Sequence, residues 1–350
     1  MACEATEQSS AGHRGCLVTF GQDVNTLPTD SRDMSDGYDV LVLRRGTHGM
    51  PVDELATELE TRLEGHGVQI ARTPTEERAL VANAPVVVGM RIDEELLAHA
   101  DRLELFACAY AGTGHLPLDA LAERGVAVTN AAGVHGPNIG EYVLGAMLTF
   151  ARRFHEGWRR QQRHEWRHFQ AFELAGSTVT VVGLGAIGQS IVDRLEPFDV
   201  ETIGVRYSPE KGGSTDEVFG FDELHEALAR TDYLALACPL TDETRGLVDA
   251  AAFETLPPDA IVVNVARGPV IDTDALVTAL QSNQIRGAFL DVTDPEPLPS
   301  AHPLWGLGNV CITPHNAGHT PRYYARLAEI VAENVHLLDE GSDEFVNRVR

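Results

Sequence analysis

A glycine pattern between a strand-like and a helix-like segment most constrains the fold of this 350-residue chain. Residues 179–190 read VTVVGLGAIGQS, an apolar run followed by Gly183, Gly185 and Gly188. In such a pattern the first glycine permits a tight turn, the second lets the backbone approach a phosphate, and the third lets helix and strand pack closely. Because the helix then directs its first amide groups at an anion, the segment predicts a site for a dinucleotide pyrophosphate.

Short apolar segments alternate with helical segments on both sides of this motif. Such alternation predicts an α/β fold with two Rossmann-like or flavodoxin-like domains, each built on a parallel sheet. We expect a dinucleotide-binding domain over residues 125–318, inserted into a substrate-binding domain formed by residues 1–124 and 319–350. A cleft between the domains is the natural place for substrate to meet cofactor. One long helix is expected over residues 139–158, and a loosely held polar tail over residues 1 to about 37.

Acidic residues outnumber basic residues 52 to 27, which gives a net charge of −25. The acids are dispersed along helix-like segments, a pattern typical of solvated helix faces. Such an excess of carboxylates disfavours nucleic acid and anionic membranes as partners. Lys211 is the single lysine among the basic residues, and dispersed acid with so little lysine predicts adaptation to concentrated salt, where ions screen self-repulsion.

The cysteines and the amino-terminal segment indicate a cellular compartment. The five cysteines, Cys3, Cys16, Cys108, Cys238 and Cys311, are odd in number and far apart. This spacing predicts reduced thiols rather than a disulfide framework or a zinc site. The first residues lack the layout of a signal peptide, and no apolar run reaches membrane-spanning length. We therefore expect a cytoplasmic protein.

The segment that follows the glycine motif bears on the choice of dinucleotide. In NAD-binding proteins, an acidic residue about 20 residues further on accepts a hydrogen bond from the ribose 2′-hydroxyl. Arg206 stands at that place, with Ser208 and Lys211 close by in sequence. An arginine cannot accept this hydrogen bond but can pair with a 2′-phosphate, which predicts a preference for NADP. The alternative is that Arg206 is only an exposed side chain and that the protein uses NAD.

Three residues with complementary chemistry, Arg267, Glu296 and His315, follow later strand-like segments, where ligands sit in open α/β sheets. An arginine can hold a carboxylate through two parallel hydrogen bonds and can polarise the adjacent carbonyl. A histidine can protonate a carbonyl oxygen as hydride arrives, and a nearby glutamate favours its protonated form and fixes its tautomer. Each residue alone has a structural explanation. Their order and placement together favour redox chemistry on a 2-keto acid.

From about Val40 to Asp339 the chain resembles the D-isomer-specific 2-hydroxyacid dehydrogenases. The motifs that carry this resemblance are GLGAIG, CPLTDETRGLV, NVARGPVID, GAFLDVTDPEP, HPLW and TPHNAG. The resemblance implies reversible, NAD(P)H-dependent reduction of a 2-keto acid to the D-2-hydroxy acid, with hydride moving from nicotinamide C4 to substrate C2. It places the family's catalytic arginine, glutamate and histidine on Arg267, Glu296 and His315.

The resemblance also implies how the substrate is held. The AGTG segment resembles the family's substrate-carboxylate loop, so the backbone amides of Gly112 and Thr113 would help Arg267 to bind the acid. We also expect Met90 and Tyr110 to line the substrate pocket. An apolar lining there would favour aliphatic 2-keto acids.

For the cofactor, the resemblance implies a contact between Asp291 and the nicotinamide carboxamide. It also implies a homodimer built largely from the cofactor domain. Motif and resemblance together predict these cofactor contacts: Gly183, Gly185, Ala186, Ile187, Gly188, Arg206, Ser208, Cys238, Pro239, Val265, Ala266, Arg267, Asp291, His315 and Gly318.

Three alternatives compete with this interpretation. Residues 164–168 read HEWRH, the zinc metalloprotease pattern HExxH, which places two histidines on one face of a helix. Because the neighbouring residues are polar and no third ligand is evident, we expect no metal site. A dinucleotide-sensing corepressor is a second alternative, which the net charge of −25 disfavours. A third alternative is oxidation of formate or phosphite on the same scaffold.

Overall fold

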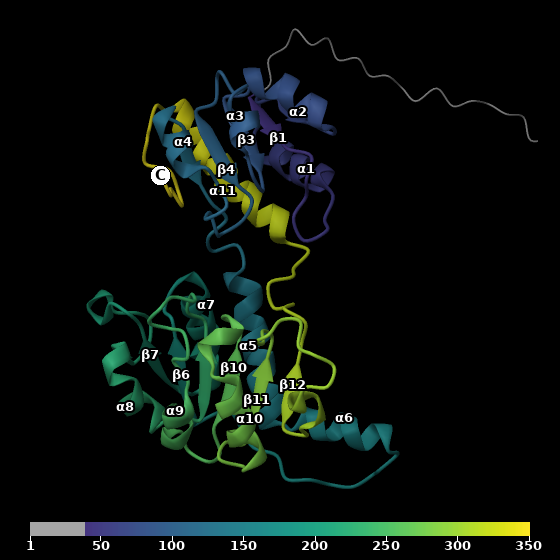
Figure 1. Ribbon diagram of the computed structural model, residues 1–350, viewed down its shortest axis with the longest axis vertical. Helices are drawn as coiled ribbons and strands as arrows, with labels where there is room; N and C mark the ends of the chain where they lie inside the picture. Colours follow the sequence, from purple (N-terminus) through teal and green to yellow (C-terminus); the bar gives the residue numbers. More distant parts are fainter. Residues whose placement is uncertain (1–38) are drawn as a thin grey trace, which may run out of the picture. The chain divides into compact units, whose positions relative to one another are not determined.

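The computed structural model describes residues 39–350, and Figure 1 shows their helices and strands. The predicted tail, Cys3 and Cys16 lie outside the described residues. The first sheet has the order β2-β1-β3-β4-β5, and all of its strands are parallel. Its order reverses direction between β1 and β3. Its strands are β1 (Val40–Val42), β2 (Val68–Ile70), β3 (Val86–Gly89), β4 (Leu105–Cys108) and β5 (Ala127–Thr129).

The second sheet contains the glycine motif and has the order β12-β11-β10-β9-β6-β7-β8, again with every strand parallel. This order reverses between β6 and β9, as in the doubly wound folds that bind dinucleotides. The predicted α/β class with two parallel sheets is thus confirmed. The strands are β6 (Thr178–Val182), β7 (Glu201–Val205), β8 (Glu217–Phe219), β9 (Tyr233–Leu236), β10 (Ile261–Asn264), β11 (Gly287–Leu290) and β12 (Val310–Ile312).

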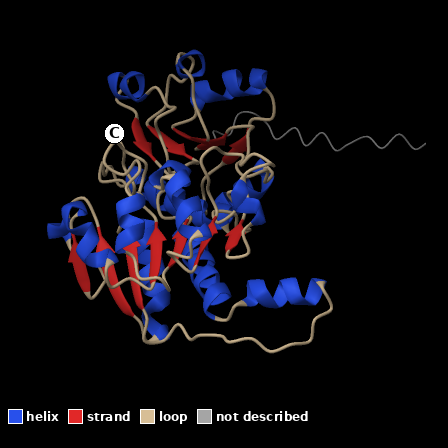
Figure 2. Ribbon diagram, turned by 60° about the horizontal axis from the view of Figure 1, so that its bottom comes forward, coloured by secondary structure: helices blue, strands red, loops and turns tan. Residues whose placement is uncertain are grey.

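Helices lie beside the strands of both sheets (Figure 2). In β9, Leu234 and Leu236 pack into one apolar cluster, whereas Tyr233 and Ala235 pack into another on the opposite face. Burial of both faces explains why these strands are continuous apolar runs. The helices are α1 (Val52–Arg62), α2 (Pro74–Leu80), α3 (Glu94–Leu97), α4 (Leu118–Glu123), α5 (Gly136–Ala151), α6 (Phe154–Gln162), α7 (Ala186–Leu195), α8 (Leu224–Leu228), α9 (Ala250–Thr255), α10 (Thr273–Gln281) and α11 (Tyr323–Asp339).

The chain passes from the first sheet to the second before α5 and returns before α11. The predicted boundary at residue 124 is too early, because β5 pairs with β4 and belongs to the first sheet. On the return, Ala317 packs in the core of the second sheet and Tyr323 in that of the first. The two crossings are joined by hydrogen bonds. The Asn138 amide donates to the Ala317 carbonyl at 2.7 Å, and Arg326 donates to the Val134 carbonyl at 2.8 Å.

The expected single helix over residues 139–158 is interrupted. α5 ends at Ala151 and α6 begins at Phe154, because Arg153 between them adopts the left-handed φ of 54°. This change of backbone conformation stops the helical hydrogen bonding of α5 and redirects the chain.

The HExxH segment is not helical, which corrects the expectation that its histidines share a helix face. α6 ends at Gln162, and His164 has a φ of 57°. No cluster of histidine, cysteine and acidic side chains suited to a metal ion occurs between residues 39 and 350. The cysteines of this part of the chain, Cys108, Cys238 and Cys311, are free thiols. Within the same range, no helix has the length and apolarity needed to cross a membrane.

Candidate active site

The glycine turn after β6 is built by close backbone contacts. Gly183 has a φ of 97°, which glycine adopts without strain, and a Cβ there would lie 2.6 Å from the backbone of Cys238 beyond β9. A Cβ on Gly188 would lie 1.9 Å from the Gly183 carbonyl oxygen. By contrast, no atom lies within 4 Å of the place where a Cβ on Gly185 would project. The turn is therefore closely packed against backbone at Gly183 and Gly188 and open to solvent at Gly185.

The open side of this turn coincides with the start of α7. Gly185 is the residue before the helix, which begins at Ala186 and Ile187 and has no side-chain cap. The first amide groups of a helix lack internal partners and carry the positive end of its dipole. Burial raises the pKa of the neighbouring Cys238 thiol to about 11, so this thiol adds no negative charge. These residues fit the pyrophosphate of a dinucleotide.

Arg206, Ser208 and Lys211 lie in one turn beyond β7. The Arg206 guanidinium donates to the Gly212 carbonyl at 2.5 Å, and its backbone amide donates to the Phe219 carbonyl at 3.0 Å. A guanidinium carries five N–H donors, so this contact still leaves donors for an anion. Ser208 directly precedes a short 3-10 helix, Pro209–Lys211.

The structure brings Glu296 and His315 together. The His315 Nδ1 atom lies 2.7 Å from the Glu296 Oε1 atom, and both side chains are partly exposed. If Nδ1 donates this hydrogen bond, the Nε2 atom is left to give or take a proton. The pair lies beyond β11 and β12, two neighbouring strands whose carboxyl ends share one edge of the sheet.

Asp291 holds the turn that carries His315. Its side chain is buried, with 3% exposed, and accepts hydrogen bonds from the Thr313 hydroxyl at 2.7 Å and from the backbone amides of Asn316 at 2.8 Å and Ala317 at 2.9 Å. The His315 amide also donates to the Asp291 carbonyl at 2.8 Å, and His315 takes a φ of 54°. Both of its carboxylate oxygens thus bind the turn that carries His315. The contact of Asp291 with the nicotinamide carboxamide stays a prediction.

Tyr142 of α5 is a site residue that the sequence analysis missed. Its hydroxyl donates to the Asp291 carboxylate at 3.1 Å and contacts the Thr313 hydroxyl. Burial raises the pKa of Tyr142 well above its usual value, so the phenol remains a hydrogen-bond donor. No local signal marks this residue, because it lies on a helix far away in sequence.

Arg267 lies beyond β10, and the Asn264 side chain fixes the backbone on which it stands. The buried Asn264 side chain accepts from the Ala266 amide at 3.0 Å and donates to the Arg267 carbonyl at 3.2 Å. A Cβ on Gly268 would lie 2.0 Å from the Thr293 carbonyl oxygen, so this loop touches the loop that carries the glutamate. The exposed guanidinium donates to the Ala266 carbonyl at 2.6 Å. Within residues 39–350 no hydrogen bond joins it to either member of the glutamate–histidine pair.

The remaining predicted residues are placed as follows. Pro239 is exposed and follows Cys238, whereas Val265 is buried beside Ala266. The Gly318 carbonyl lies 2.9 Å from the His135 Nδ1 atom at the crossing between the sheets. His135 was not predicted, and burial is the main cause that lowers its pKa.

The predicted substrate loop follows β4. Gly112 is exposed, with no atom within 4 Å of its would-be Cβ, and Thr113 is half-buried. The loop is tied to the neighbouring strand ends, since His115 Nε2 lies 2.6 Å from the Met90 carbonyl oxygen. The Tyr110 ring packs edge-on against His115, with centroids 6.1 Å apart.

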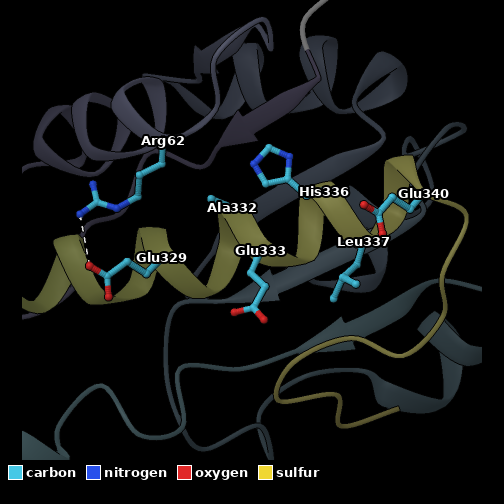
Figure 3. Close-up of a pocket in the computed structure, with 7 residues that line it drawn as sticks. All are labelled: Arg62, Glu329, Ala332, Glu333, His336, Leu337 and Glu340. Atoms are coloured by element: carbon cyan, nitrogen blue, oxygen red, sulfur yellow. Dashed lines mark hydrogen bonds and ion pairs between the residues drawn. The ribbon is translucent and has the colours of Figure 1, made fainter.

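A separate hollow of about 410 Å³ lies between α1 and α11 (Figure 3). An ion pair of 3.5 Å between Arg62 and Glu329 borders it, and Glu333, His336 and Glu340 complete its polar lining. No residue of the predicted site lines this hollow. We therefore place the candidate active site at the carboxyl edge of the second sheet.

Comparison with known proteins identifies the family. Residues 144–317 match the family model "D-isomer specific 2-hydroxyacid dehydrogenase, NAD binding domain". The chain is 34% identical over 254 residues to a glyoxylate reductase of Thermofilum pendens, which covers 70% of this chain and 74% of that protein. This chain belongs to the D-isomer-specific 2-hydroxyacid dehydrogenase family. Members of this family are NAD(P)-dependent oxidoreductases of small hydroxy and keto acids, and the chain contains their NAD-binding domain.

Two further similarities extend this result. A crystal structure of a D-isomer specific 2-hydroxyacid dehydrogenase from Xanthobacter autotrophicus Py2, in complex with NADPH and MES, is 28% identical with a TM-score of 0.71, and covers 90% of this chain and 98% of that chain. The D-3-phosphoglycerate dehydrogenase of Methanocaldococcus jannaschii is 34% identical over 290 residues, which make up 80% of this chain. The chain spans only 55% of the length of that relative.

Proposed function

We propose that this protein catalyses the reversible reduction of a 2-keto acid to the D-2-hydroxy acid. The observation that carries the proposal is the 2.7 Å contact between His315 Nδ1 and Glu296 Oε1, on a turn fixed by Asp291. A buried carboxylate that binds two backbone amides keeps this turn in one conformation. The imidazole is therefore presented in a defined orientation before any ligand arrives.

The residues of the chain divide the work of the reaction. The glycine turn and the start of α7 would hold the pyrophosphate of NAD(P)H, which supplies hydride to the keto carbon when bound. Arg267 would bind the substrate carboxylate through its two-pronged guanidinium, with help from the amides of Gly112 and Thr113.

His315 would act as the general acid. Its Nδ1–H group would donate to Glu296, which fixes the orientation of the ring. Its Nε2–H group would then give a proton to the carbonyl oxygen as the substrate is reduced, leaving a neutral ring. In the reverse direction, the neutral Nε2 atom takes the hydroxyl proton.

We propose NADP as the preferred cofactor, because Arg206, Ser208 and Lys211 gather in the turn beyond β7 and leave guanidinium donors for a 2′-phosphate. The test compares kcat/KM for NADPH and NADH in the natural protein and in Arg206→Ala. We expect the variant to lose efficiency with NADPH alone. A natural protein that favours NADH would contradict this assignment.

We also propose a homodimer. Four large side chains of residues 154–172 are substantially exposed, which is typical of a surface that another protein covers. They are Phe154, Trp158, Trp166 and Phe172, exposed by 50%, 55%, 100% and 40%. Sedimentation should give a dimer for the natural protein and a monomer for Trp158→Glu.

The net charge of −25 further supports a protein adapted to concentrated salt. Structure and activity should then be lost on dialysis into low-salt buffer and regained when salt is restored. Circular dichroism and the oxidation of NADPH would follow both changes.

The central test is oxidation of NADPH or NADH with a panel of 2-keto acids, followed by chiral analysis of the product. Turnover to the D-2-hydroxy acid supports the proposal. If the protein binds the dinucleotide but reduces none of the acids, the proposed reaction is wrong.

A further inference from the structure

The first sheet has its own reversal of strand order, which lies between β1 and β3. Figure 1 labels these two strands. In open α/β sheets, ligands bind outside the carboxyl ends of the strands at such a point. A hollow of about 170 Å³ lies at this place. It is lined by Leu43, Arg44 and Arg45, which follow β1, by Met90 and Arg91, which follow β3, and by Glu77, Asp93 and Leu96.

The carboxylates that line this hollow have partners within the chain. Glu77 is bound to Arg44 through both the Nε atom at 3.0 Å and the backbone amide at 3.1 Å. The Asp93 carboxylate accepts from the Leu96 amide at 2.9 Å, where it caps α3. Both carboxylates of the hollow thus have partners.

Arg45 and Arg91 remain exposed, and neither guanidinium has an ion-pair or hydrogen-bond partner in the described part of the chain. In a protein with 52 acidic and 27 basic residues, a carboxylate partner is easily supplied. Among residues 39–350 these two guanidiniums have no partner, and they lie at the point where this fold binds ligands, so they are available to an external anion.

The hollow adjoins the predicted substrate loop. β1, β3 and β4 are consecutive neighbours in the sheet, so their carboxyl ends lie within two interstrand spacings, about 10 Å. His115 of the substrate loop binds the Met90 carbonyl, and Arg91 also lines a second hollow, together with Gly114 and His115. An extended small acid held at Gly112 can therefore direct its far end toward the two arginines.

We infer that Arg45 and Arg91 bind an anionic group at the far end of the substrate. This inference rests on the proposed function and narrows its substrate class to 2-keto acids with a second carboxylate or a phosphate. It differs from the expectation of an apolar lining, because Met90 lines this hollow together with charged side chains. A guanidinium pairs with either anion through parallel hydrogen bonds.

The first experiment compares substrates of similar size with and without a second charge. 2-Oxoglutarate carries a distal carboxylate, 3-phosphohydroxypyruvate a phosphate, and 2-oxovalerate neither. We expect the natural protein to favour one of the charged acids over 2-oxovalerate, and the favoured acid tells which anion the site accepts.

Variants then locate the anion site. Arg45→Ala and Arg91→Ala should each raise KM for the favoured acid at least about 10-fold, while kcat changes little, because this contact is the same in ground and transition states. Kinetics with 2-oxovalerate should not change. Arg102→Ala is the matched control, since Arg102 is an exposed arginine that precedes β4 at the opposite edge of the sheet. Equal losses with charged and neutral acids, or a natural preference for 2-oxovalerate, would overturn the inference.

The second experiment does not depend on catalysis. Calorimetry at constant ionic strength measures binding of inorganic phosphate to the whole protein. Because the glycine turn, Arg206 and Arg267 also offer places for an anion, the number of phosphates bound per chain is compared. We expect the natural protein and Arg102→Ala to bind the same number, and the double variant Arg45→Ala/Arg91→Ala to bind one fewer. An unchanged number in the double variant contradicts the anion site. If no 2-keto acid is reduced at all, the proposed function fails, and the phosphate titration still decides whether the site exists.

Discussion

The carboxyl edges of the two sheets differ in how firmly the chain fixes them. At the edge of the second sheet, backbone atoms approach so closely that Gly183, Gly188 and Gly268 accept no side chain, and Asp291 binds two amides of the turn that carries His315. At the edge of the first sheet, Gly112 has no atom near its would-be Cβ, and two arginines lack partners among residues 39–350. The residues proposed for the reaction thus stand on closely packed backbone, whereas those proposed to bind the far end of the substrate are exposed.

The largest expected change in activity comes from a substitution at the carboxyl edge of the second sheet. His315→Ala should lower turnover by about 10² to 10⁴, the usual contribution of general acid–base catalysis, because the variant lacks the imidazole proposed to donate the proton. NADPH binding, measured by fluorescence, should be retained. His336→Ala on α11 serves as the control and should leave both quantities unchanged. Normal turnover in His315→Ala would remove this residue from the mechanism.

Arg267→Lys should lower kcat/KM by roughly 10- to 100-fold, since an ammonium group keeps the charge but loses the two parallel hydrogen bonds. Steady-state kinetics with the preferred 2-keto acid give this value. Arg245→Lys, at an exposed arginine, is the matched control. Near-normal efficiency of Arg267→Lys would show that the guanidinium geometry is not used.

Asp291→Asn tests whether the hydrogen bonds that hold the His315 turn contribute to activity. In this variant an amide nitrogen, which can only donate, would face a backbone N–H group where a carboxylate oxygen now accepts. We therefore expect the free energy of unfolding to fall by about 1–3 kcal/mol and kcat to fall about 10-fold. Tyr142→Phe removes one donor and leaves both backbone contacts, so its effect should be smaller. Denaturant melts and kcat should therefore rank the two variants in this order. A larger effect of Tyr142→Phe would mean that the backbone contacts are not what holds the turn.

The smallest expected effect is a pH dependence of stability that arises from two histidines, His48 and His135. Burial is the main cause that lowers the pKa of His48 and His135, whose rings lie 5.3 Å apart, so the folded chain binds fewer protons than the unfolded chain. Stability is therefore full above the ordinary histidine pKa of about 6.5 and declines as pH falls below it. The melting temperature should drop between pH 7.5 and 5.5, and less so in His135→Asn. The exposed His99→Asn variant should keep the full drop, and an equal drop in His135→Asn would exclude this histidine as its cause.

Features that local spacing determines were predictable from the sequence. The glycine turn and the alternation of strands and helices each depend on a few consecutive residues, and the structure shows them as expected. Glu296 and His315 were paired through their placement after successive strands, since parallel strands bring their ends to one edge.

Features that depend on distant contacts were missed or misassigned. The short segment of β5 gave no sign that it pairs with β4, and Arg153 carries no signal for a left-handed φ. The hydrogen bonds of Asp291 to the turn that carries His315 were not predicted, because sequence alone does not show which amides a carboxylate meets. For the same reason, the sequence did not show that Arg45 and Arg91 lack partners among residues 39–350.

The buried carboxylate of Asp291 has an evolutionary consequence. Because one side chain binds both a core helix and the turn that carries His315, a mutation there that destabilises the protein would also be expected to lower its proposed activity. Selection for stability and selection for activity would then both retain an aspartate at this position. Residues at the carboxyl edge of the first sheet could be replaced more freely, and such replacements could change which substrates are accepted.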